Sequence, residues 1–129
     1  MTRIVWMSRH TPTHRQRTTL EAIYPQHHLI IDNRAFDSAD DIIARWRMAS
    51  ADEMVLVAPM TVIREIVKRG LHPLHAEMQQ IPCSHPESEV RVKGRCYRFV
   101  GFRRIKAVNF ELEPLSQTTQ MTKTKGDAK

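Results

Sequence analysis

The sequence predicts an α/β fold: a mainly parallel sheet with helices on both faces and a β-hairpin appended toward the C-terminus. Three observations lead to this fold class. Short apolar runs alternate with amphipathic helical patterns over residues 4–78, which favours parallel strands joined by right-handed crossovers. Residues 89–102 instead alternate between apolar and polar side chains on either side of Lys93–Gly94, a pattern typical of half-exposed strands. The 129 residues are enough for one core. Together these patterns predict a single Rossmann-like domain over residues 1–115.

The predicted strands and helix in the first quarter of the chain have clear boundaries in the sequence. Ile4–Met7 is a short apolar run and predicts a buried strand. Thr13 and Gln16 have the spacing of a capping box, which opens a helix that ends before Pro25. His28–Asp32 follows as a second strand. This order of elements predicts the first strand–helix–strand unit of the sheet.

The same alternation continues in the next segment. Ser38 is a favourable N-cap for a second helix, and Met54–Val57 reads as a third buried strand. A third helix is expected from about Thr61, with Gly70 as its C-cap. Residues 74–78 alternate and indicate a fourth strand. These elements complete the predicted parallel part of the sheet.

The C-terminal part has a different character. Residues 81–88 contain two prolines and predict a loop, and residues 89–102 predict a hairpin that turns at Lys93–Gly94. Residues 105–112 predict one more strand. From 116 to 129 the chain is polar and basic, so we expect a disordered tail there.

Positive charge is concentrated near the predicted hairpin. The chain has a formal net charge of +6, and residues 89–106 hold seven basic side chains against Glu89 alone. Such a concentration favours a polyanionic partner. It is equally typical of a solvated sheet edge that avoids aggregation. The sequence leaves both interpretations open.

Several classes of protein are disfavoured by composition. The chain has neither a Gly-x-Gly-x-x-Gly motif nor a P-loop, so ordinary dinucleotide or ATP binding is not expected and no cofactor is predicted. No apolar run approaches the roughly 20 residues that span a bilayer. No signal peptide is recognised, and two cysteines, Cys83 and Cys96, suit reduced thiols. We therefore expect a cytoplasmic protein without membrane contact.

Three histidines and a cysteine fall close enough in the sequence to raise the question of a zinc site. His72, His75, Cys83 and His85 are close in sequence, but there is no paired Cys-x-x-Cys. On a strand, His72 and His75 would also point to opposite faces. No metal site is predicted.

A candidate ligand site lies where the predicted strands end. Residues 8–13, 33–38 and 58–61 follow three strands at their carboxyl ends, which is where open α/β sheets bind ligands. Helix N-termini there favour phosphate, and Arg9 and Arg34 add charge. The alternative is that these residues serve only as helix caps and turns.

Ser8 lies two residues before His10, and Thr13 and Gln16 follow His10 at intervals of three. This arrangement resembles the first strand and turn of small CRISPR-associated Rossmann-fold (CARF-like) and ring nuclease-type proteins. The resemblance implies a homodimer that binds a cyclic oligoadenylate or another RNA-like phosphate ligand. It also implies either sequestration of the ligand or its metal-independent cleavage by transesterification, with Ser8, Arg9 and His10 as catalytic candidates. The ligand-binding candidates are Thr11, Thr13, Arg34, Thr61, Arg95 and Arg98.

Two other functions compete with this one. Arg9, His10 and Thr13 also resemble the opening motif of the histidine phosphatases, although Thr11 replaces the glycine and residues 54–64 lack the second histidine. The other alternative is a non-catalytic, basic nucleic-acid-binding module, for which exposed aromatic residues are scarce.

Overall fold

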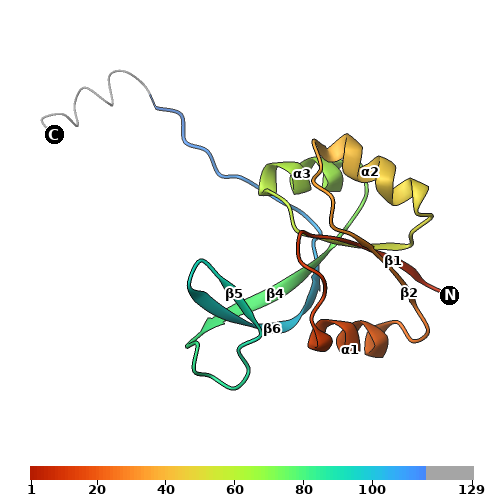
Figure 1. The fold of residues 1–129 in the computed structure, drawn as a ribbon. Coiled ribbons are helices and arrows are strands. Elements are labelled where there is room, and N and C mark those ends of the chain that lie inside the picture. The colour runs from red at the N-terminus through yellow and green to blue at the C-terminus, as the bar shows by residue number, and fades with distance from the viewer. Residues whose placement is uncertain (116–129) are drawn as a thin grey trace, which may run out of the picture.

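The computed structural model describes residues 1–115 (Figure 1), so the predicted basic tail at 116–129 lies outside the described residues. A six-stranded sheet carries three helices. The elements in chain order are β1 (Arg3–Met7), α1 (His14–Ile23), β2 (His28–Asp32), α2 (Ala39–Met48), β3 (Glu53–Leu56), α3 (Met60–Lys68), β4 (Leu74–Ile81), β5 (Val90–Val92) and β6 (Arg95–Arg104).

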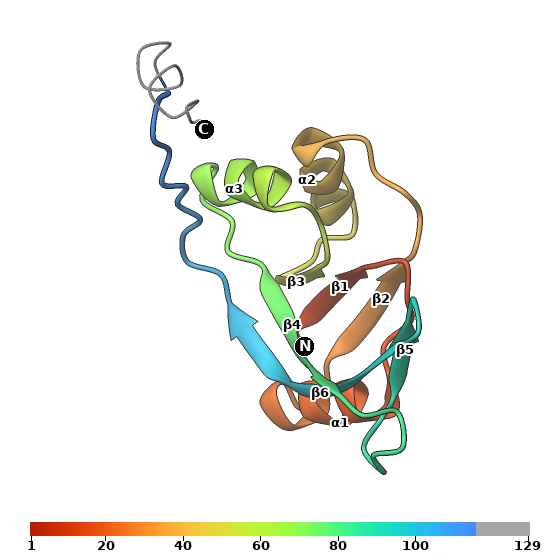
Figure 2. The same ribbon diagram turned by 90° about the vertical axis from the view of Figure 1, so that its left-hand side faces the viewer.

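The sheet is mixed, which corrects the expectation of a mainly parallel one. Its strand order is β2-β1-β3-β4-β6-β5. Strands β2, β1, β3 and β4 run parallel, whereas β6 is antiparallel to both β4 and β5. The predicted hairpin is therefore not a separate appendage. Strand β6 pairs with the whole length of β4, from Leu74 opposite Arg104 to Ile81 opposite Cys96. It therefore continues the sheet (Figure 2).

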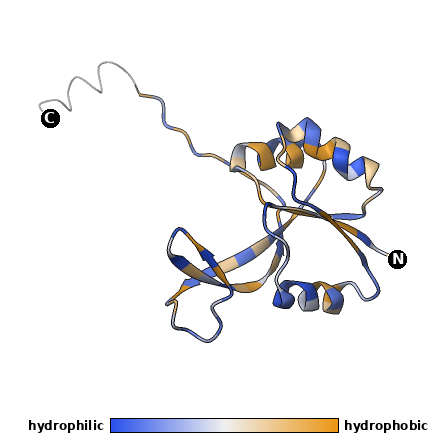
Figure 3. Cartoon of the chain, in the orientation of Figure 1, coloured by the Kyte–Doolittle hydropathy of each residue, from blue (hydrophilic) through white to orange (hydrophobic). Residues whose placement is uncertain are grey.

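Helices cover both faces of the parallel strands, as predicted. Helix α1 lies on one face, and α2 and α3 lie together on the other (Figures 1 and 2). Alternate residues of β1 supply the two cores: Trp6 packs on the α1 side with Leu20, and Val5 packs on the other side with Ile42 and Ile66. Figure 3 shows the central strands as largely hydrophobic. This alternation fixes which side of each strand end faces which helix.

The N-caps of α1 and α2 are those that the sequence predicts, whereas the C-cap of α3 is Arg69 and not the expected Gly70. The Thr13 hydroxyl accepts a hydrogen bond from the Gln16 backbone N–H at 3.2 Å, and the Gln16 side-chain oxygen accepts one from the Thr13 N–H at 2.8 Å. The Ser38 hydroxyl accepts one from the Asp41 N–H at 3.2 Å. Helix α3 begins at Met60, directly after Pro59.

The predicted strand at 105–112 is wrong. Strand β6 runs through Arg104 because its pairing with β4 extends to Leu74, and residues 105–115 form no helix or strand. Part of this segment still packs on the protein, since Val108 contacts the core between the sheet and helices α2 and α3. The Arg64 guanidinium lies 5.2 Å from the centre of the Phe110 ring.

Cys83 and Cys96 form a disulfide bond, so the expectation of two reduced thiols is wrong. The physical reason is the pairing of β4 with β6. It places Cys96 opposite Ile81, two residues before Cys83, and the two Cα atoms are 5.1 Å apart. No helix among residues 1–115 is both long and apolar enough to cross a membrane.

Candidate functional site

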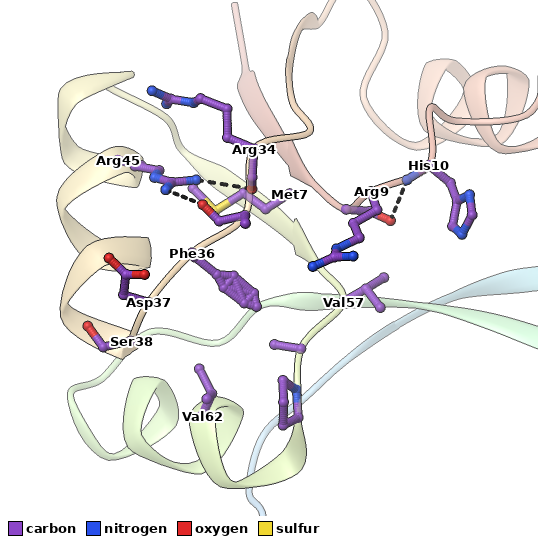
Figure 4. A pocket seen from close by; sticks show the side chains of 14 residues that line it. Met7, Arg9, His10, Arg34, Phe36, Asp37, Ser38, Arg45, Val57 and Val62 are labelled. Atoms are coloured by element: carbon purple, nitrogen blue, oxygen red, sulfur yellow. Dashed lines mark hydrogen bonds between the residues drawn. The ribbon is translucent and has the colours of Figure 1, made fainter.

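A pocket of about 560 Å³ opens at the carboxyl ends of β1, β2 and β3, where the sequence places the candidate site. The segments that follow these three strands form its walls (Figure 4). Its lining residues are Met7, Ser8, Arg9, His10, Arg34, Ala35, Phe36, Asp37, Ser38, Arg45, Val57, Ala58, Pro59 and Val62.

Three hydrogen bonds hold the segment after β1 in place. The Trp6 indole N–H donates to the His10 carbonyl at 2.8 Å, and the His10 backbone N–H donates to the Ser8 hydroxyl at 3.2 Å. The Asn33 side-chain amide donates to the Ser8 carbonyl at 2.6 Å. Because the indole is buried in the core, this loop has a defined shape before any ligand binds.

Arg9 carries a positive charge that no other described residue neutralises. Its guanidinium is exposed and forms no hydrogen bond or ion pair within residues 1–115. Figure 4 shows this side chain directed over the pocket toward Val57, whereas the His10 ring is turned to the other side of the loop. The Ser8 hydroxyl is engaged with the His10 backbone N–H. Of the three catalytic candidates, Arg9 is therefore the group best placed to meet an anion.

The arginines of the opposite wall are paired. Arg34 donates two hydrogen bonds to the Asp32 carboxylate, at 2.9 and 2.7 Å, and these bonds are the main reason why the pKa of Asp32 is lowered. Arg45 donates to Asp41 and to the Arg34 and Ala35 carbonyls. Arg45 thus shapes the loop that forms this wall, while the Arg34 side chain remains 72% exposed.

An apolar surface lies between the two walls. Phe36 is half-buried, Val57 is 56% exposed, and Pro59 and Val62 line the same side of the pocket. Figure 4 shows the Phe36 ring between the Arg9 and Val62 side chains. Sequence reasoning missed Phe36; the signal was an aromatic residue within the polar loop that precedes the Ser38 cap. The site combines an aromatic surface with a cation that is unpaired in the described part of the chain.

The structure brings together some of the predicted site residues. Ser8, Arg9, His10 and Arg34 line the pocket, whereas Thr11, Thr13 and Thr61 do not. Thr13 is engaged in the capping box, and Thr61 is exposed on α3.

The two basic candidates of the hairpin lie elsewhere. Arg95 and Arg98 belong to β6, which β3 and β4 separate from β1 in the sheet. Arg98 is paired with Glu87 at 2.6 Å and with Gln79 at 2.8 Å.

Groups needed for some alternative chemistries are not assembled in the described part of the chain. Within residues 1–115, no cluster of three or more His, Cys, Asp or Glu side chains is arranged to hold a metal ion. Among these residues, His10 is the only histidine that lines the pocket. The second histidine of the histidine phosphatase pattern thus has no counterpart there.

Comparisons with known proteins give little further information. No protein-family model matches the chain, and no curated protein is significantly similar to it. Among solved structures, a variant of HypX from Aquifex aeolicus with four substitutions aligns with a TM-score of 0.41 and 15% sequence identity. The alignment covers 63% of this chain and 14% of HypX, so the chain spans a small fraction of that protein.

Proposed function

We propose that this chain binds a phosphate-bearing nucleotide, specifically a cyclic oligoadenylate, in the pocket at the carboxyl ends of β1, β2 and β3. The observation that carries the proposal is the Arg9 guanidinium, which has no partner within residues 1–115, beside the aromatic surface of Phe36. A guanidinium recognises phosphate oxygens through charge-assisted hydrogen bonds, and an aromatic ring stacks on a base. The pocket offers both within one site.

The surrounding backbone also favours an anion. Helix α3 begins at Met60, and its N-cap, Pro59, makes no side-chain capping hydrogen bond, so the N–H groups of Met60 and Thr61 can meet an acceptor at the pocket wall. The partial strand order β2-β1-β3-β4 is that of doubly wound folds, which bind ligands beyond the carboxyl ends of their strands. We include a Rossmann-like assignment for these four strands in the proposal.

The proposal further includes a homodimer. A ring of repeated adenylates has rotational symmetry, and a two-fold pair of chains presents two copies of Arg9 and Phe36 to it. Light scattering should then give twice the chain mass of 15.0 kDa. A concentration-independent mass equal to one chain would contradict the dimer.

Binding without turnover is the form of the function that the site supports best. Cleavage would have a ligand 2′-hydroxyl attack the adjacent phosphorus, releasing a 5′-hydroxyl and leaving a 2′,3′-cyclic phosphate. Transfer of the two protons needs a base and an acid in reach. Since the His10 ring is turned away from the apolar surface (Figure 4), it would have to rotate to serve. Sequestration needs no such movement.

Calorimetric titration with cyclic oligoadenylates of several ring sizes tests the proposal. Arg9→Ala should weaken binding by about 1.5–3 kcal/mol, which is the value of a hydrogen bond to a charged group. Arg17→Ala is the matched control because Arg17 is an exposed arginine on α1 outside the pocket. Thr13→Ala should cost about 1 kcal/mol of stability and leave affinity unchanged. Equal affinity of Arg9→Ala and the parent would refute the site.

A second assay separates cleavage from sequestration. Product analysis without added metal shows whether the bound ring is opened. If it is, His10→Ala should slow turnover by roughly 100-fold or more while affinity changes little. An intact ring after long incubation would assign the chain to sequestration.

A further inference from the structure

The tip of the β5–β6 hairpin carries cations that have no partner in the described part of the chain. Arg91, Lys93 and Arg95 are all exposed, and none forms an ion pair or side-chain hydrogen bond within residues 1–115. The other arginines of β6 are different. Arg98 is paired with Glu87, and Arg103 and Arg104 are paired with carboxylates of β4 and β3.

The nearby carboxylates cannot compensate this tip, because they are already engaged. Residues 74–104 contain three acidic side chains, which are Glu77, Glu87 and Glu89. Glu77 pairs with Arg103, Glu87 pairs with Arg98, and Glu89 accepts a hydrogen bond from the Phe99 N–H at 3.2 Å. Among the described residues, the three cations of the tip therefore form a patch of positive charge without a paired carboxylate.

The register of the hairpin places these charges on both of its faces. Arg91 pairs with Cys96, and Val92 pairs with Arg95. Because successive residues of a strand point to opposite faces, Arg91 and Arg95 project in opposite directions. Lys93 lies between them in the turn, where its φ of 50° and the φ of 78° at Gly94 form the tight connection. Figure 1 shows this hairpin extending away from the helices.

The base of the hairpin is held rigidly. The Cys83–Cys96 disulfide ties β6 to the loop between β4 and β5, and the Arg98–Glu87 pair joins the same two segments. A rigid ribbon loses little entropy when it docks. The disulfide and this ion pair therefore restrain the backbone from which the three cationic side chains project.

We propose that this hairpin tip is a second binding site, separate from the pocket, that contacts the phosphates of double-stranded DNA. The major groove of B-DNA, about 12 Å wide, admits a two-stranded β-ribbon. Cations on both faces of such a ribbon reach phosphates on both walls of the groove. Single-stranded nucleic acid fits less well, since the segment from Val90 to Arg95 holds no aromatic side chain on which bases could stack.

Fluorescence anisotropy with a labelled DNA duplex at salt concentrations between about 50 and 200 mM tests the proposal. Three phosphate contacts predict a slope of about −2.7 for the logarithm of the binding constant against that of the salt concentration. The test variant combines Arg91→Gln, Lys93→Asn and Arg95→Gln; asparagine before Gly94 preserves the turn. Its affinity should fall by roughly tenfold or more, with a slope near zero.

A control variant removes the same charge from other places. Arg17→Gln, Arg47→Gln and Lys106→Gln alter three exposed cations that form no ion pair in the described residues. This variant should bind DNA within about twofold of the parent. If both variants lose the same affinity for DNA, net charge alone explains the binding and the proposal is overturned. Undiminished DNA affinity of the hairpin variant would overturn it as well.

Two further measurements complete the test. A hairpin-dependent preference for single-stranded RNA over duplex DNA would overturn the assignment to duplex. Thermal unfolding followed by circular dichroism should give the hairpin variant the parent's midpoint; if it does not, the single variants Arg91→Gln and Arg95→Gln replace it, each expected to reduce the salt slope by about 0.9. The hairpin variant should keep the parent's affinity for cyclic oligoadenylate, whatever that affinity is.

Discussion

The Arg104 guanidinium donates two hydrogen bonds to the Glu53 carboxylate, from Nη1 to Oε1 at 2.9 Å and from Nη2 to Oε2 at 2.7 Å. The same carboxylate accepts a hydrogen bond from the Tyr24 hydroxyl at 3.0 Å, and Arg104 also donates to the His72 carbonyl. Burial and the contact with Glu53 raise the pKa of Tyr24. This network joins the end of β6 to the start of β3 and the end of α1, opposite the pocket.

Arg104→Ala should therefore destabilise the fold without altering the pocket. The Glu53 side chain is only 18% exposed, so loss of the Arg104 guanidinium leaves a largely buried carboxylate with fewer hydrogen-bond donors. We expect a loss of about 1–3 kcal/mol in the free energy of unfolding, measured with urea. Arg103→Ala is the control: its pair with Glu77 is exposed and should contribute less than about 1 kcal/mol. Equal effects of the two substitutions would contradict this role for Arg104.

The contrast between caps and strand pairing shows what sequence can predict. The Thr13 and Ser38 caps depend on side chains and amides three residues apart, so local pattern is sufficient to place them. The pairing of β4 with β6 joins residues up to 30 positions apart, from Leu74 to Arg104. Nothing in the local pattern says that β6 continues past residue 102 or that Cys96 comes to lie near Cys83.

The candidate site shows the same difference between features set by local sequence and features set by distant contacts. Ser8, Arg9 and His10 were predictable because they directly follow a buried strand, and parallel strands share one carboxyl edge. For Arg95 and Arg98 the sequence offers only their charge, and charge gives no position in the sheet. Phe36 was missed because its contact with the pocket depends on how the loop after β2 folds against α2, held there by Arg45.

Reduction of the Cys83–Cys96 disulfide should destabilise the protein. The bond closes a loop with a sequence separation of 13 residues, for which restriction of the unfolded chain corresponds to about 2–4 kcal/mol. The double variant Cys83→Ser and Cys96→Ala should show this loss with or without reductant, while the parent shows it only with reductant. A thiol reagent that labels both cysteines in the denatured, unreduced parent would contradict the bond.

Acid should weaken the wall formed by Arg34 and Asp32. The Arg34 hydrogen bonds hold the pKa of Asp32 below its ordinary value of about 3.9. A carboxylate with a lowered pKa contributes stability above its unfolded-state pKa, and that contribution is lost as the pH falls through the folded-state value. Urea unfolding from pH 6 to pH 2, as a rough range, should show a steeper acid loss for the parent than for Asp32→Asn. As a control, Glu65→Gln, at an exposed position on α3, should leave the dependence of unfolding free energy on pH unchanged. If the curve of Asp32→Asn runs parallel to that of the parent, the Arg34–Asp32 contact does not cause the acid loss.

The buried indole of Trp6 should matter for ligand affinity although it lies outside the pocket lining. Its N–H donates to the His10 carbonyl at 2.8 Å and so fixes the loop that carries Arg9. Trp6→Phe keeps an aromatic ring in the core but removes this donor, which should cost about 1–3 kcal/mol of stability.

The matched control for Trp6→Phe is Val5→Ala, which leaves a cavity on the other face of β1 and should cost a similar amount of stability without releasing the loop. If the hydrogen bond preorganises Arg9, Trp6→Phe should weaken binding of an anionic nucleotide by several-fold, whereas Val5→Ala should bind like the parent at a temperature where both variants are folded. Hydrogen exchange should report faster exchange at residues 8–11 only in Trp6→Phe, because only there is the loop released. Equal affinities of the two variants would mean that the loop keeps its shape without the indole and that Trp6 acts on packing alone.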